Sequence, residues 1–183
     1  MKKIFWVTLI LLAASFAACT HTGGRSRPTA YSFTVDIPEG WRRIDRPYLL
    51  ITKEGPFLQN IMIQNRFIGQ SFRYTKKKMQ RGMLPEEAAQ IIIDEFASDQ
   101  NIGNLKVLNN TPAEISGHPG FKILLTYMGP KGNEFHTLYY GFIKADTFFN
   151  LRFTAGGRQY FQKDIETFKH MLHSFQVVKA STS

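Results

Sequence analysis

Cysteine is almost absent from this chain of 183 residues, which contains a single one, Cys19. One thiol can form neither an intramolecular disulfide nor a cysteine-rich metal site. Common catalytic signatures are absent too: the sequence has no G-x-S-x-G segment, no H-E-x-x-H segment and no glycine-rich loop with the Lys and Ser or Thr that bind phosphate. We therefore predict no catalytic residue, no metal and no cofactor, and expect that the protein is not an enzyme.

The histidines do not form a recognisable functional set. His170 and His173 are three residues apart and could share one helix face, but no carboxylate pattern beside them completes a metal site. His136 is alone on a predicted strand, and Ser116-Gly117-His118 is interpreted as part of a turn. We interpret His170 and His173 as surface or boundary residues.

Residues 1–18 have the organisation of a secretory signal peptide. Lys2 and Lys3 give a cationic start, and 15 uncharged residues follow from Ile4 to Ala18. As a helix this stretch would be about 22 Å long, at ~1.5 Å per residue, which is short of the about 30 Å hydrocarbon core of a bilayer. The sequence therefore predicts a cleaved leader rather than a permanent transmembrane helix.

The leader ends in a segment, Phe16-Ala17-Ala18-Cys19, that resembles the lipobox of bacterial lipoproteins. Ala17 and Ala18 match the small residues of that pattern, whereas Phe16 stands where the family most often has Leu. The resemblance implies cleavage before Cys19, a diacylglyceryl thioether on its sulfur, and acylation of its new amine. The alternative is an ordinary leader that is cleaved after Ala18 and leaves Cys19 free.

Residues 19–30 are predicted to form a lipidated tether, because they contain two Gly, one Pro and no large apolar side chain. The lipoprotein resemblance implies that the membrane is a partner, held through Cys19. Thr20 follows the cysteine where inner-membrane lipoproteins usually have Asp. The resemblance therefore implies the outer membrane, facing the periplasm, if the host has two membranes.

Hydrophobic patterning predicts an α+β domain over residues 31–178. The 43% apolar content, with 16 Phe, excludes a chain disordered throughout, and helical spacing predicts helices at 84–98 and 158–174. Residues 69–82 fit neither pattern, 117–120 are predicted to form a turn, and 179–183 to fray. The element order predicts an antiparallel β-sheet with helices packed on its faces. Strands are predicted at 31–37, 48–52, 60–67, 105–109, 113–116, 121–127, 135–144 and 147–155.

Two segments of this domain resemble the PsbP-like family. Residues 33–41 (FTVDIPEGW) form a strand, a proline turn and an aromatic, and residues 117–175 combine a turn, three strands and a helix ending in His173-Ser174-Phe175. The family includes a photosystem II extrinsic protein, a fungal Ran-binding protein and many bacterial lipoproteins. The resemblance covers about residues 31–178. It implies a sheet sandwiched by helices in a binding or assembly module, without catalytic residues and without a photosystem or Ran partner.

Basic residues are concentrated in the first half of the domain. Residues 25–81 contain twelve Lys or Arg and four Asp or Glu, whereas residues 82–183 contain nine and ten. The acid-free part of this region is a candidate anionic-surface site, and a solvated basic loop is the alternative. Candidate partners are anionic lipid head groups or an acidic envelope protein, and nucleic acid is not expected. The candidate residues are Arg66, Arg73, Lys76, Lys77, Lys78 and Arg81.

The sequence thus predicts a lipid-anchored bacterial envelope protein that acts as a non-enzymatic binding or assembly module. The alternative is a lipoprotein that binds a small apolar ligand in a pocket between sheet and helix. A hydrolase of unrecognised type is the third hypothesis. Most aromatic residues lie at alternating strand positions, where core packing explains them.

Overall fold

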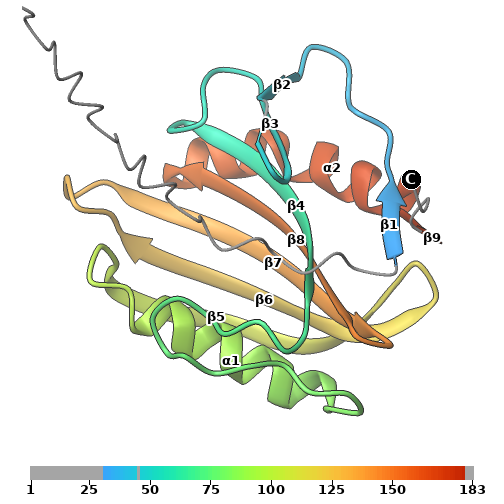
Figure 1. The fold of residues 1–183 in the computed structure, drawn as a ribbon. Helices are drawn as coiled ribbons and strands as arrows, with labels where there is room; N and C mark the ends of the chain where they lie inside the picture. The colour runs from blue at the N-terminus through green and yellow to red at the C-terminus, as the bar shows by residue number, and fades with distance from the viewer. Residues whose placement is uncertain (1–30, 45, 180–183) are drawn as a thin grey trace, which may run out of the picture.

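The computed structural model describes residues 31–44 and 46–179. Seven strands form one antiparallel sheet in the order β2-β3-β4-β8-β7-β6-β5 (Figure 1). The predicted leader (1–18), the tether (19–30) and residues 180–183 of the tail lie outside the described residues. The elements are β2 (Arg42–Ile44), β3 (Leu49–Thr52), β4 (Gln59–Phe67), α1 (Pro85–Ala97), β5 (Gly103–Ile115), β6 (His118–Met128), β7 (Glu134–Lys144), β8 (Thr147–Gly156) and α2 (Gly157–Ser174).

The two helices cover opposite faces of the sheet, which gives the fold three layers (Figure 1). Helix α1 packs on β5, β6 and β7, whereas α2 packs on β8, β7 and β4. Successive side chains of a strand point to opposite faces of the sheet, so the strands contribute residues to both cores. Phe121 and Leu125 face α1, and Phe149 and Phe153 face α2. All four side chains are at most 1% exposed. The prediction of an α+β fold with helices on an antiparallel sheet is confirmed.

Helix α1 begins where the capping signals of the sequence place it. Pro85 occupies the first position, where the missing N–H costs nothing. The Glu87 carboxylate accepts a hydrogen bond of 2.9 Å from the backbone N–H of Leu84. The predicted helix 84–98 is one residue longer than α1 at each end, and the predicted helix 158–174 begins one residue after α2.

Strand β5 is continuous, which corrects the prediction of two short strands at 105–109 and 113–116. It pairs with β6 along its length, and the register shifts between Gly103 and Lys106 and between Val107 and Asn109. Pro112 does not end the strand, because β5 lies at the edge of the sheet and needs hydrogen bonds on only one side.

The turn predicted at 117–120 is also corrected. Ser116 and Gly117 have φ angles of 50° and 74°, as a two-residue hairpin turn requires. Gly120 therefore already belongs to β6. A Cβ atom on Gly120 would lie 2.4 Å from the carbonyl oxygen of Gly141 on β7, so close packing of these strands requires a glycine there.

Strands β1 (Tyr31–Thr34) and β9 (Gln176–Lys179) form a separate two-stranded ribbon. The strand predicted over 31–37 is shorter because β9 offers only four partners. Lys179, which was predicted to fray, pairs with Tyr31. The Phe33 ring stacks on Phe175 with 5.5 Å between centroids, which joins the ribbon to the core under α2.

Candidate functional site

Arg66, the first of the six candidate basic residues, has a structural role. Its guanidinium donates hydrogen bonds of 3.0 Å to the carbonyl oxygens of Gln70 and Ser71. Its Cζ lies 4.2 Å from the centroid of the Phe72 ring. Burial lowers the pKa of Arg66, although an arginine stays cationic in proteins. Arg66 therefore fixes the start of the 69–82 loop instead of presenting an open charge.

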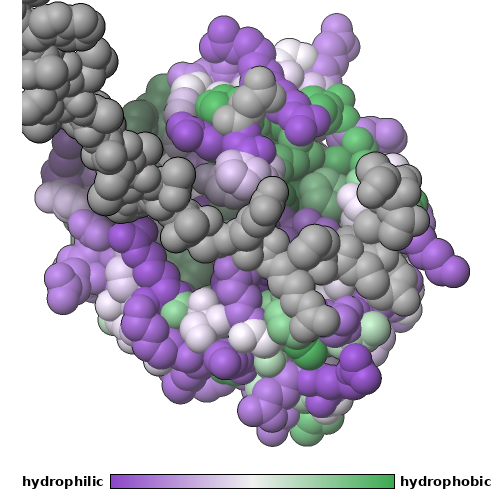
Figure 2. Space-filling view, in the orientation of Figure 1, coloured by the Kyte–Doolittle hydropathy of each residue, from purple (hydrophilic) through white to green (hydrophobic). Residues whose placement is uncertain are grey.

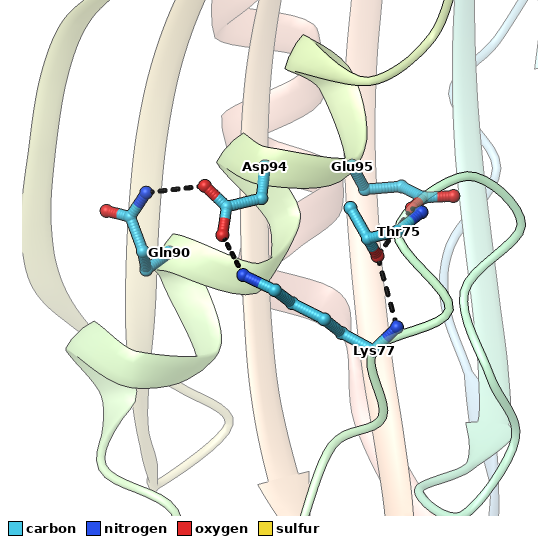
Figure 3. A network of polar contacts seen from close by, with 5 residues as sticks. All are labelled: Thr75, Lys77, Gln90, Asp94 and Glu95. Carbon is cyan, nitrogen blue, oxygen red and sulfur yellow. Dashed lines mark hydrogen bonds and ion pairs between the residues drawn. The ribbon is translucent and has the colours of Figure 1, made fainter.

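The other five candidates lie in the 69–82 loop. Lys77 pairs with Asp94 of α1, which also accepts a hydrogen bond of 2.8 Å from Gln90 (Figure 3). The hydrogen bond from Lys77 lowers the pKa of Asp94. Lys76 Nζ donates a hydrogen bond of 2.6 Å to the carbonyl oxygen of Arg73. The candidates whose side chains are exposed and make no ion pair with another described residue are Arg73, Lys76, Lys78 and Arg81.

Glu95 of α1 holds this loop against the helix (Figure 3). One carboxylate oxygen accepts a hydrogen bond from the backbone N–H of Tyr74, and the other accepts from the backbone N–H and hydroxyl of Thr75, each at 2.9 Å. Burial would raise the pKa of Glu95, but these hydrogen bonds favour the ionised form and the pKa falls below its ordinary value. The acid that interrupts the apolar side of the predicted helix is therefore the anchor of the loop.

Glu95→Gln is expected to lower the free energy of unfolding by about 1–3 kcal/mol at neutral pH, because hydrogen bonds to a charged acceptor are weakened or lost. The folded-state pKa of Glu95 is depressed, so its contribution is fully present above the unfolded value of about 4.3. That contribution disappears as the pH falls through the folded pKa.

Urea unfolding at several pH values measures this effect. The difference between wild type and Glu95→Gln should shrink as the pH falls below about 4.3. Glu86→Gln, which changes an exposed carboxylate on the same helix, should have little effect. A difference that is constant with pH, or an equal loss in the control, would contradict the role of Glu95.

The basic loop lies against an acidic helix. It contributes five basic side chains, and α1 carries Glu86, Glu87, Asp94 and Glu95. Asp94 and Glu95 are engaged with the loop, so the accessible positive charge comes from the four exposed cations. The face of the molecule seen in Figure 1 is mostly hydrophilic, with smaller hydrophobic areas between (Figure 2).

The histidines of α2 lie at the surface, in line with their interpretation. His170 and His173 are both exposed. Within residues 31–44 and 46–179, no three His, Cys, Asp or Glu side chains gather into a potential metal site. In the same residues, no helix combines the length and the apolar character needed to span a bilayer.

A cavity of about 520 Å³ lies between α2 and the sheet, and a pocket between sheet and helix is what the small-ligand alternative predicts. Its walls include Leu124 of β6 and Phe161 and Ile165 of α2. The His136 ring lies 5.5 Å from the Phe161 ring, and a ring nitrogen lies 3.2 Å from a Glu134 carboxylate oxygen. His136 therefore forms part of this mostly apolar wall.

A second cavity, of about 320 Å³, lies beside the C-terminal end of α1 and is lined in part by Arg152. Arg152 is on β8, where its partners across the sheet are Met62 of β4 and Tyr139 of β7. Arg152 is not among the candidate residues predicted from the sequence. The available signal was a cation inside the otherwise apolar or uncharged segment 147–155.

No family model and no curated protein matches this chain, but solved structures share its fold. Cyanobacterial PsbP (CyanoP) from Synechocystis sp. PCC 6803 has a TM-score of 0.55 at 12% identity, covering 89% of this chain and 99% of that one. LpqN of Mycobacterium tuberculosis, described as involved in cell envelope biogenesis, has 0.57 at 11% identity, covering 83% and 86%. The Saccharomyces cerevisiae Ran-binding protein Mog1p has 0.53 at 11% identity, covering 80% and 90%. The chain therefore has the PsbP/Mog1-like α+β fold that the sequence resemblance implied.

Proposed function

We propose that this chain is a bacterial envelope lipoprotein, anchored through acyl chains on Cys19, whose domain is a non-enzymatic binding or assembly module. The observation that carries the anchor is the position of the only cysteine, directly after 15 uncharged residues that end in Ala17-Ala18. One acyl chain gives marginal membrane binding, whereas two or more hold a protein firmly. Replacing Cys19 by Ala, and following acylation, tests the anchor.

The fold supports a binding role. Among the similar structures, Mog1p is described as Ran-binding and LpqN as involved in cell envelope biogenesis. These descriptions belong to those proteins, and a shared fold does not transfer a partner. They favour a binding or assembly role over catalysis for the domain, and LpqN favours an envelope location.

The exposed cations of the 69–82 loop form the surface that we assign to an anionic partner. Glu95 and the pair of Lys77 with Asp94 hold the loop in place, so little ordering entropy is lost when it binds. If residues 20–30 form the tether predicted from their composition, these eleven residues would reach about 18 Å as a random coil, which would bring the domain close to lipid head groups. Each basic residue near an anionic surface contributes about 1 kcal/mol.

Lys76→Glu with Lys78→Glu is expected to weaken binding to phosphatidylglycerol vesicles roughly 30-fold, since two such contacts are lost. Vesicle sedimentation measures this with a chain that begins at residue 20 and carries no leader. The control, Lys53→Glu with Arg158→Glu, changes the net charge equally at two exposed positions outside the loop. Unchanged binding of the loop variant would contradict a lipid-facing loop, and equal weakening of the control would show that net charge alone acts.

A further inference from the structure

The cavity beside the C-terminal end of α1 has an aromatic wall. Its volume is about 320 Å³, which is within the lower range of small-molecule sites. The rings of Phe96 and Tyr127 lie 5.9 Å apart, and those of Tyr127 and Phe135 lie 5.4 Å apart and stack. Tyr74, from the 69–82 loop, also lines the cavity. Three elements and the loop therefore present a continuous surface suited to an apolar or aromatic body.

Arg152 is the one Lys or Arg side chain among the described residues that line this cavity. Its Nε atom is buried and has no hydrogen-bond partner within residues 31–44 and 46–179. Its Nη2 lies 3.6 Å from the Met62 sulfur, and a thioether is a weak acceptor. Among the described residues, no carboxylate lies within ion-pair distance of Arg152. A buried N–H donor without a partner is rare in folded proteins and calls for an acceptor.

The two carboxylates of the cavity accept hydrogen bonds from other residues, and among the described residues neither forms an ion pair with Arg152. Glu95 accepts three hydrogen bonds of 2.9 Å from Tyr74 and Thr75. Asp99 Oδ1 accepts hydrogen bonds of 2.9 and 3.0 Å from the backbone N–H and side-chain amide of Asn101. Arg152 is thus the cation in the lining of this cavity, and its hydrogen-bonding capacity is not filled by the described residues.

We infer that this cavity binds a small monocarboxylate with an aromatic or apolar body, with the carboxylate on Arg152 and the body against Phe96, Tyr127 and Phe135. A guanidinium matches a carboxylate through parallel N–H donors. Glu95 and Asp99 line the same cavity, and their negative charges repel a dianion such as a phosphate monoester more strongly than a monoanion. This site lies within the domain and is independent of the proposed acylation of Cys19.

Calorimetric titration of the full chain, purified as the cell produces it, tests the site with benzoate, 3-phenylpropionate and indole-3-acetate as probes. The amide of the best-binding probe has nearly the same shape without the charge. It should bind roughly tenfold more weakly or worse, because the hydrogen bonds to a charged group are lost. Phenyl phosphate should bind more weakly than the carboxylates.

The variant arm uses Arg152→Gln, with Arg158→Gln as the control, since Arg158 is exposed and lies outside this cavity. Arg152→Gln should bind acid and amide equally weakly, and Arg158→Gln should bind like wild type. The inference is overturned if none of the three acids binds at millimolar concentration, if wild type binds acid and amide equally, or if Arg152→Gln retains full affinity. The acid-to-amide comparison on wild type remains decisive even if Arg152→Gln does not fold. None of these outcomes changes the vesicle-binding or acylation results. A failure of the ligand site is therefore distinguishable from a failure of the proposed function.

Discussion

Phe153→Ala is expected to lower the free energy of unfolding by about 3–5 kcal/mol, because it removes a large buried ring and leaves a cavity. Phe153 lies in the middle of the sheet on β8 and is 0% exposed. Its ring stacks on Phe161 and Phe168 of α2, with centroids 5.4 and 5.8 Å away. The substitution therefore removes contacts that join the sheet to α2.

Phe57→Ala is the matched control, because Phe57 is 86% exposed in the turn between β3 and β4. It should change the free energy of unfolding by no more than about 0.5 kcal/mol. Urea unfolding, followed by the fluorescence of Trp41 in the same core, measures both variants. Similar losses in the two variants would contradict the packing described for the α2 face.

Cys19→Ala is expected to abolish acylation completely and to leave the leader uncut, because no sulfur remains to form the thioether. Labelling of cells with a radioactive fatty acid, together with the size of the product on a gel, measures both effects. The uncut leader can itself hold the chain at a membrane, so this variant alone does not test release.

A second variant distinguishes membrane attachment through the lipid anchor from attachment through the uncut leader. It combines Cys19→Ala with an ordinary cleavable signal peptide in place of residues 1–18. The product should be released from membranes, because a buried acyl CH₂ is worth about 0.8 kcal/mol and the variant has none. A wash at ~1 M salt, where the Debye length is about 3 Å, removes attachments through the exposed cations. Retention of the released form after that wash would contradict a lipid anchor as the main attachment.

The fold was largely predictable from local patterns. In both helices the apolar residues recur with the helical period. The start of α1 is also recognisable, because Pro85 follows Leu84. The hairpin of β7 and β8 has alternating apolar residues on either side of Ala145-Asp146. Local rules failed where pairing with a distant strand decides the outcome. Pro112 ends no strand because β5 is an edge strand, and β1 is short because its partner, β9, lies at the other end of the chain.

The candidate sites were less predictable, because they depend on side chains that only the fold brings together. The basic stretch is evident in the sequence. The sequence does not show that Arg66 binds loop carbonyls whereas four other cations are exposed. In the sequence, Glu95 is only an acidic residue that interrupts the apolar face of a helix. Its role follows from its contacts with Tyr74 and Thr75 in the fold. Arg152 becomes a candidate only because its neighbours in the folded sheet leave its Nε without an acceptor.

The lipid anchor is tested most directly by the intact mass of the mature protein after detergent extraction from membranes. A chain that begins at Cys19 and exceeds its polypeptide mass by a diacylglyceryl group and an amide-linked acyl chain is the predicted result. A mature chain with an unmodified Cys19, or a chain that still begins at Met1, would contradict the account.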